Sequence, residues 1–345
     1  MRFVSAGPQL PGFPWGLRQA SMKRLGCALV MLGLAGLAPV AVAQGEAYPA
    51  RPIKMIVPFP PGGTSDIMGR LIAAKLSEQL GQQVVVDNRG GANGNIGSNL
   101  VAKAEPDGYT LVLSGVGSHA INQSLYRSIP HHVVNDFTHI GMIAKGPNTL
   151  VVNPDFEAKN LKQLVDIARA NPGKLSYASS ASGSSNHLSM EMLKSAAGLE
   201  ITHIPYKGGG PAITDVMAGH VPMMFINFDA ALPYVQAGKL RALAMTGTER
   251  SRALPETPTV AESGYADFSA ESWTGVSGPP KMPGPIVERL NTEIVKAVQA
   301  PDVKERLAKL GLTPVLYSPR QMTEFVAAEV QKWGKAVKAS GAQVD

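Results

Sequence analysis

The amino-acid sequence predicts an α/β protein built from two lobes. Short apolar runs alternate with segments whose apolar residues recur every three or four positions, a pattern typical of strands that alternate with helices. Without the leader described below about 300 residues remain, and that size favours two lobes or domains. Turns rich in Gly, Ser and Thr follow several expected strands, so ligand contacts are expected where those strands end.

A strand, a glycine turn and a helix open the first lobe. Residues 53–59 form a short apolar run, and the Pro-Pro-Gly-Gly segment at residues 60–63 closes it. A helix is expected from there to Gly81, since its apolar residues share one face. Strands at residues 83–86 and 110–113 flank a helix at residues 96–104, which predicts a parallel sheet with right-handed crossovers.

A second series of strands and helices starts near Thr149 and predicts the second lobe. Its strands are expected at residues 149–152, 175–178, 201–204, 222–226 and 240–245. Its helices are expected at residues 160–170, at residues 186–197 and from Pro211 to Gly219. The C-terminal part is mostly helical, with helix starts at Pro285, Pro301 and Pro319. We assign residues 44–145 and 247–345 to lobe 1 and residues 146–246 to lobe 2.

Residues 1–43 are typical of a secretory signal peptide. Lys23 and Arg24 precede an apolar run at residues 25–42 that ends in small residues, and cleavage is expected after Ala43. A membrane anchor is the alternative, but the run contains Gly and Pro and ends in small residues before a polar one. Met22 is an equally conventional start for such a signal. We therefore expect a protein that is exported from the cytoplasm.

Charge and cysteine content exclude several classes of function. Four of the 32 Lys and Arg residues lie in the leader, which leaves 28 against 26 Asp and Glu, so nucleic acid is not an implied partner. Cys27 is the only cysteine and precedes the apolar run. The mature chain would then have no thiol for catalysis, metal binding or disulfides.

Several strand-to-helix turns could bind an anion, because unpaired backbone N–H groups and the helix dipole meet there. The candidate ligand-binding residues lie in these turns or just after the strand that ends near residue 226: Pro61, Gly62, Gly63, Thr64, Asp66, Ser114, Ser118, Ser182, Gly183, Ser184, His187, Tyr206, Lys207, Asn227 and Asp229.

Some of these residues also have plain structural interpretations. Asp66 would cap the helix and complement its dipole. The serine-rich segment at residues 179–185 resembles a flexible linker as well as a positioned turn. His187 could bond a neighbouring backbone group, and Lys207 could be solvated.

Signatures of enzymes and metal sites are weak. The sequence has no phosphate-binding loop, no His-Glu-x-x-His and no Gly-x-Ser-x-Gly motif. The seven histidines are spread out, so no metal or other cofactor is expected. A remote alternative is an exported hydrolase that uses Ser184 or Ser185 with His187, although nothing supplies a third group to orient the imidazole.

A family resemblance spans nearly the whole mature chain. The segments that carry it are Tyr48-Pro49, Arg51-Pro52-Ile53, Pro58 to Asp66, Val85 to Arg89, Gly94 to Gly97, Pro106 to Leu111, Asp136 to Thr138, Tyr206 to Gly208, Gly238 to Ala244 and Pro258 to Gly264. These resemble the Bug or TctC-like family, the substrate-binding proteins of tripartite tricarboxylate transporters. Gly90, where the family often has Pro, is a departure outside the expected anion site.

The resemblance implies a two-lobed periplasmic binding protein of type II, or Venus flytrap, with a hinge between its lobes. It implies a monomer without enzymatic activity that delivers its ligand to a two-subunit membrane permease, and a sensor histidine kinase is the alternative partner. A ligand carboxylate is expected between residues 62–64 and residues 182–184. Tyr206, Lys207, Asn227 and Asp229 would then surround the distal part of the ligand.

Overall fold

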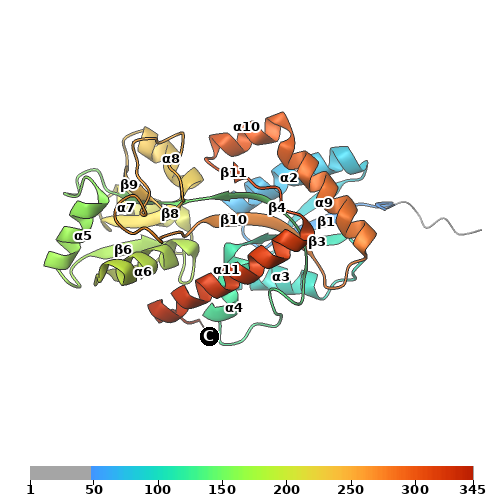
Figure 1. Cartoon of the computed structure of the whole chain (residues 1–345), viewed down its shortest axis with the longest axis horizontal. Helices are drawn as coiled ribbons and strands as arrows, with labels where there is room; N and C mark the ends of the chain where they lie inside the picture. The colour runs from blue at the N-terminus through green and yellow to red at the C-terminus, as the bar shows by residue number, and fades with distance from the viewer. Residues whose placement is uncertain (1–47, 345) are drawn as a thin grey trace, which may run out of the picture. The chain divides into compact units, whose positions relative to one another are not determined.

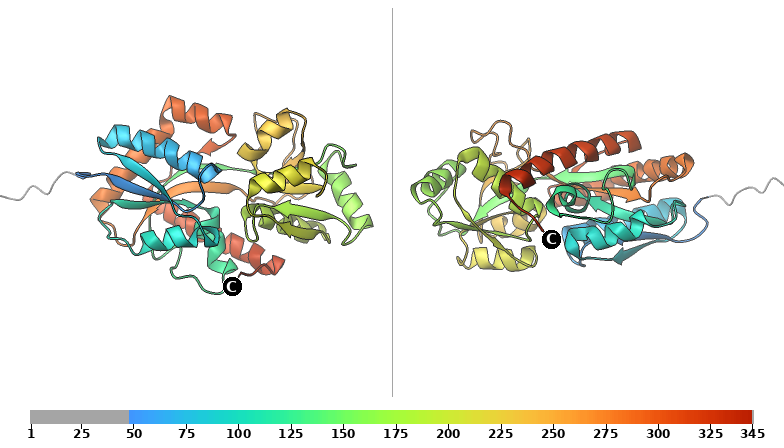
Figure 2. Two further views of the ribbon diagram at one scale, coloured as in Figure 1. Left: turned by 180° about the vertical axis from the view of Figure 1, so that it is seen from behind. Right: turned by 90° about the horizontal axis from the view of Figure 1, so that it is seen from below.

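Two separate β-sheets organise residues 48–344, the part of the chain that the computed structural model describes (Figure 1). These residues form one compact unit. The expected signal peptide at residues 1–43 lies outside the described residues. Figure 2 shows the two sheets side by side, with long strands running from one toward the other.

The first sheet has the strand order β11-β4-β10-β3-β1-β2 within the described residues. Its strands are β1 (Ile53–Val57), β2 (Val84–Asn88), β3 (Thr110–Gly115), β4 (Thr138–Gly146), β10 (Ser272–Gly278) and β11 (Thr313–Pro314). β1 pairs in parallel with β2 and β3, whereas β10 pairs antiparallel with β3 and β4. The sheet is therefore mixed, and the expectation of a parallel sheet holds only for β1, β2 and β3.

The first sheet is accompanied by helices and helical turns. They are α2 (Thr64–Leu80), the single turn η1 (Ala92–Gly94), α3 (Asn95–Ala102), the π-helical turn η2 (Gly117–Ile121), α4 (Asn122–Leu125), α9 (Gly284–Gln299) and α10 (Pro301–Lys309). Of these, α2 ends before the expected Gly81 and α10 begins at the expected Pro301, whereas α9 begins one residue before Pro285. Gly81 ends α2 in the left-handed conformation that glycine adopts without strain. α2 and α9 share one buried apolar cluster with the strands, which includes Ile72, Leu76 and Leu290.

The second sheet has the strand order β7-β6-β8-β5-β9 within the described residues. Its strands are β5 (Asn148–Val152), β6 (Ser176–Ser179), β7 (Thr202–Pro205), β8 (Met223–Asn227) and β9 (Arg241–Met245). Its helices are α5 (Leu161–Ala170), α6 (Ser185–Ala197), α7 (Gly209–Met217) and α8 (Phe228–Gln236). β6 is parallel to β7 and β8, and β5 is antiparallel to β8 and β9.

Helix α11 (Pro319–Ser340) packs against elements of both sheets. Ser318 caps it in a reciprocal arrangement with Gln321, which satisfies backbone N–H groups at the start of the helix. One apolar cluster contains Trp333 of α11, Leu188 of α6 and Met142 of β4, so the helix joins the two sheets through a continuous core. Figure 2 shows α11 lying across both parts.

Several elements of the structure were missed in the sequence, and the start of α7 was misplaced. The missed elements are strands β4, β10 and β11, helices α4 and α8 and the turn η2. Helix α7 begins at Gly209, so Pro211 is its third residue and not its first. The expected helix starts at Pro301 and Pro319 are confirmed.

Candidate ligand-binding cleft

A cleft of about 670 Å³ lies where turns from both sheets meet. Its lining comes from residues 59–61, 63–65, 91, 93–94, 113–117, 180–181, 184–186, 206–209 and 272–274 together with Asn227. Pockets of a few hundred to a thousand Å³ are typical of sites for small organic ligands. The strand-end turns expected from the sequence therefore do converge on one place.

The expected candidates divide into two groups. Those that line the cleft are Pro61, Gly63, Thr64, Ser114, Ser184, Tyr206, Lys207 and Asn227. Those that are not part of its lining are Gly62, Asp66, Ser118, Ser182, Gly183, His187 and Asp229. Direct ligand contact by any of these residues stays a prediction.

The first turn joins β1 to α2. Gly62 has a φ of 85°, and its N–H donates to the Asp66 carboxylate at 3.0 Å. Asp66 also accepts hydrogen bonds from Arg70 and Asn88. The Arg70 bond, followed by the Gly62 bond, lowers the pKa of the Asp66 carboxyl to about 2. The charged carboxylate thus holds the turn from within, in line with the capping interpretation.

The second turn joins β6 to α6. Gly183 has a φ of 73°, and its N–H donates to His187 Nδ1 at 3.0 Å. Ser184 is the N-cap: its hydroxyl accepts the His187 backbone N–H and donates to the Ala181 carbonyl. The imidazole of His187 is buried and stacks on His203, with ring centroids 3.9 Å apart.

Protonation of His187 is unfavourable in this environment. Burial, followed by the charge of His203, lowers the pKa of His187 to about 3. The imidazole is therefore neutral near pH 7, and Nδ1 keeps the lone pair that accepts the Gly183 N–H. No serine hydroxyl of residues 179–185 bonds an imidazole nitrogen of His187 in the described structure, so the hydrolase constellation is not assembled.

The third turn joins β7 to α7 and is hydrogen-bonded to the second turn. The backbone N–H of Tyr206 donates to the Ser179 carbonyl at 3.0 Å, and that of Gly208 donates to the Ser180 carbonyl at 2.8 Å. The Tyr206 hydroxyl donates to Asp215 at 2.6 Å. Burial and this bond raise the pKa of Tyr206 to about 12. The hydroxyl of Tyr206 is thus engaged with Asp215.

Three asparagines form a polar network along the second sheet's side of the cleft. Asn186 at the start of α6 donates to Asn148 at 3.0 Å and to Asn227 at 3.3 Å. The Asn186 oxygen accepts the Ser180 hydroxyl at 2.6 Å. Because each of these side chains is held by another, the network is a rigid set of donors and acceptors. Asn186 lines the cleft but was not among the expected ligand residues.

The two serines after β3 have different environments. Ser114 lines the cleft and accepts a hydrogen bond from Ser277 at 3.1 Å. Ser118 is fully buried, and its hydroxyl lies 2.9 Å from His119 Nδ1. Ser118 is therefore part of the polar interior behind the cleft.

Sequence reasoning also missed part of the lining. Ser272, Trp273 and Thr274 enter from β10, which had not been expected as a strand. Asn93 and Gly94 line the cleft from the single turn η1 and were not among the expected ligand residues. Asn186 stood beside the serine-rich turn, and its position at the helix start could have identified it.

Charge in the cleft is sparse. Lys207 is the only charged side chain in the described lining, and the remaining polar groups are hydroxyls, amides and backbone groups. The described residues also contain no group of three or more His, Cys, Asp or Glu side chains that could hold a metal ion. None of the helices within residues 48–344 is long and apolar enough to cross a membrane.

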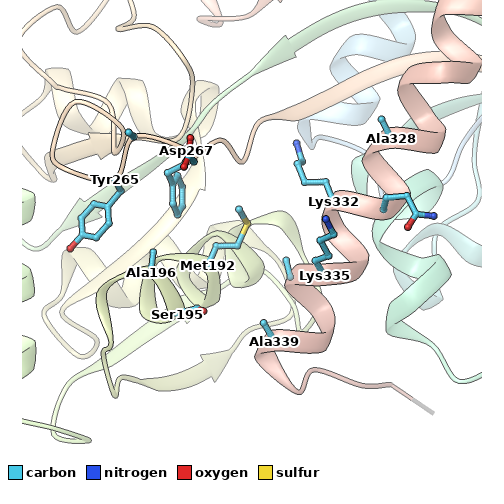
Figure 3. Close-up of a pocket in the computed structure, with 13 residues that line it drawn as sticks. Met192, Ser195, Ala196, Tyr265, Asp267, Ala328, Lys332, Lys335 and Ala339 are labelled. Atoms are coloured by element: carbon cyan, nitrogen blue, oxygen red, sulfur yellow. The ribbon is translucent and has the colours of Figure 1, made fainter.

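A second hollow, of about 760 Å³, lies between α6, residues 265–268 and α11 (Figure 3). Its walls are mostly apolar and include Met192 and Phe268, with Lys332 and Lys335 of α11 at its border. Although it is larger than the cleft, no strand-to-helix turn opens into it. The cleft is therefore the better candidate for a carboxylate site.

Comparison with known proteins agrees with the geometry. The profile of the Tripartite tricarboxylate transporter family receptor, TctC, matches residues 68–342. The chain is 42% identical to BugT of Bordetella pertussis over 316 residues, which cover 91% of this chain and 96% of that protein. It is also 42% identical over 293 residues to a UPF0065 protein of Pseudomonas sp. strain P51, which covers 85% of this chain and 87% of that protein.

Solved structures show the same fold. R. palustris Rpa4515 with adipate has a TM-score of 0.80 and 39% identity, and covers 86% of this chain and 100% of its own. Periplasmic binding protein BugD has a TM-score of 0.77 and 34% identity, with 86% and 99% coverage. MatC of Rhodopseudomonas palustris with bound malate has a TM-score of 0.76 and 30% identity, with 84% and 100% coverage. This chain therefore belongs to the Bug/TctC family and has the two-lobed α/β fold of its periplasmic solute-binding proteins.

Proposed function

We propose that this protein binds a small organic carboxylate in the periplasm and delivers it to a two-subunit membrane permease. The observation that carries the proposal is that helix-starting turns from both sheets line one cleft. Backbone N–H groups at a helix start carry partial positive charge and bind anions. The related structures with adipate and malate support a carboxylate as the ligand class.

Ligand contact with both lobes explains how binding would favour closure of the lobes around the ligand. A carboxylate that accepts hydrogen bonds from the start of α2 and from the start of α6 binds the closed arrangement better than an open one. The lobes that we propose are residues 44–145 with 247–345, and residues 146–246. The sheets support this division, because the strands of the second sheet all lie between residues 148 and 245. No chemical step is needed.

Lys207 favours a second negative group on the ligand. As the only charged side chain in the described lining, it can offset one more charge than the backbone groups do. We therefore propose a dicarboxylate, with one carboxylate at the two turns and the other near Lys207.

Calorimetry with matched ligands tests both parts of this proposal. We expect adipate or malate to bind, and Lys207→Met to raise the Kd of adipate about tenfold, the value of one lost charge-assisted contact. Hexanoate, which has the same chain length and one carboxylate, should bind the variant and the unchanged protein within about threefold. If no carboxylate bound the folded protein, the proposed function would be wrong. Equal losses for adipate and hexanoate would refute only the role of Lys207.

Export is a separate part of the proposal. When the full chain is expressed in a Gram-negative host, the periplasmic fraction should contain a protein whose first residue is Gln44. Intact mass measurement of that fraction checks the cleavage site. A full-length chain retained in the membrane would support the anchor alternative instead.

A further inference from the structure

One hydrogen bond joins the two lobes directly beside the cleft. The Thr64 hydroxyl donates to Asp229 Oδ2 at 2.5 Å, across 165 residues of sequence. Thr64 is the first residue of α2, on the first sheet, and Asp229 lies in the first turn of α8, on the second. Among the candidate residues, Thr64 thus belongs both to an expected anion turn and to an interlobe contact.

The start of α8, next to Asp229, is fixed by a backbone hydrogen bond and by close packing around Phe228. The Phe228 backbone N–H donates to the carbonyl of Pro147, which lies between β4 and β5, where the chain passes from one sheet to the other. Gly311 of lobe 1 approaches the Phe228 ring so closely that a Cβ atom there would lie 2.0 Å from it. The interlobe bond therefore sits next to close packing, and small lobe movements would change its length.

The Asp229 carboxyl group has the Thr64 hydroxyl as a side-chain hydrogen-bond partner. Its other oxygen, Oδ1, is buried and has no hydrogen-bond partner among the described residues. Burial raises the pKa of the Asp229 carboxyl, and the Thr64 bond opposes that rise. A small cavity is lined by Thr64, Asp229 and Lys145 among other residues. The ammonium group of Lys145 pairs with Glu271 at 2.8 Å. A buried carboxylate oxygen without a partner is costly, so loss of the Thr64 bond would leave the Asp229 carboxylate still less well satisfied.

We propose that the Thr64–Asp229 bond is an interlobe bond that stabilises the closed arrangement, with Asp229 as a positioning residue. Asp229 would act through Thr64: it holds the start of α2 against the second lobe, at the separation that lets both turns reach one carboxylate. The Thr64 hydroxyl is then committed to Asp229, and Thr64 contributes only its backbone N–H to the ligand. This inference rests on the proposed function and adds a hydrogen bond between the lobes in which no ligand atom takes part.

A double-mutant cycle tests the coupling. We expect Thr64→Val and Asp229→Ala each to raise the Kd of the bound carboxylate roughly tenfold or more, since hydrogen bonds to charged groups are among the stronger ones. The double variant should bind no more weakly than the weaker single variant. Thr64→Ser keeps the hydroxyl and should bind within about threefold of the unchanged protein. Additive losses in the double variant, or a Thr64→Ser variant as weak as Thr64→Val, would overturn the proposal.

A second measurement needs no ligand and separates this inference from the proposed function. Spin labels on Gln83→Cys in lobe 1 and Glu200→Cys in lobe 2, both exposed positions, report the distance between the lobes in a chain that also carries Cys27→Ser. In the ligand-free protein, Thr64→Val should shift the distance distribution away from that of the unchanged protein, and Thr64→Ser should not. Identical distributions for all three proteins would overturn the proposal, whether or not a carboxylate binds. Thermal unfolding of each variant identifies any that does not fold.

Discussion

The two anion turns have the same construction but different chemistry. In each, a glycine with positive φ precedes the N-cap and donates its N–H to a side chain four residues later, from Gly62 to Asp66 and from Gly183 to His187. The donor–acceptor distance is 3.0 Å in both. Both arrangements resemble a capping box in which a side chain of the first helical turn reaches back to a backbone N–H.

The difference lies in how each turn is fastened and how much room it has. Both side chains are buried, but Asp66 is a charged carboxylate with Arg70 beside it, whereas His187 is a neutral imidazole. A Cβ atom on Gly62 would meet nothing within 4 Å, but one on Gly183 would lie 2.0 Å from the Leu125 side chain. The same backbone geometry is therefore reached by a solvent-tolerant turn in one lobe and by an enclosed turn in the other.

The largest expected effect comes from adding a methyl group at the two glycines. Gly183→Ala combines a strained φ with overlap against Leu125, so we expect it to lower the free energy of unfolding by roughly 2–4 kcal/mol. Gly62→Ala carries only the conformational strain and should cost about 1 kcal/mol. Urea unfolding measures both. Equal losses would show that the second turn is not enclosed.

The next effect is a difference in acid sensitivity. Because the folded-state pKa of His187 lies below 6.5, the protein loses stability from this group as the pH falls from 6.5 toward about 3. His187→Gln cannot titrate, so its unfolding free energy should fall less than that of the unchanged protein between pH 7 and pH 5, by about 2 kcal/mol.

Asp66 supplies the control for that measurement. Its lowered pKa stabilises the fold above pH 3.8, and this contribution is lost only as the pH falls toward about 2. Asp66→Asn should therefore leave the pH dependence between pH 7 and pH 5 unchanged. A steeper or shallower slope for Asp66→Asn in that range would contradict the assignment of the two fastening groups.

The smallest effect concerns the caps of the two helices. The Ser184 hydroxyl caps α6, whereas Gly63 gives α2 no side-chain cap. Ser184→Ala should destabilise the ligand-free protein by about 1 kcal/mol, and Gly63→Ser should stabilise it by a few tenths, since a Cβ at Gly63 meets nothing within 4 Å. Thermal unfolding checks both signs, and a stabilised Ser184→Ala variant would be the contrary result.

Local chemistry explains which elements could be predicted. Helix α2 lies between its glycine turn and Gly81, and α10 and α11 begin at Pro301 and Pro319, because each signal acts within one helical turn of the residue that carries it. Strands β4 and β10 were missed, and β10 enters the first sheet between β3 and β4 only after the chain has completed the second lobe. That placement also makes the sheet mixed, which the alternation of strands and helices could not indicate.

The site divides in the same way. The sequence by itself determined that glycine- and serine-rich turns start helices and can offer N–H groups to an anion, because turn chemistry and the helix dipole are local properties. Asp66 and His187 hold their turns through bonds to residues four positions away, which the sequence could suggest, but only the tertiary structure decided that Thr64 meets Asp229. The partner of a side chain across two lobes depends on how the sheets and helices pack, and residues 165 positions apart share no local signal.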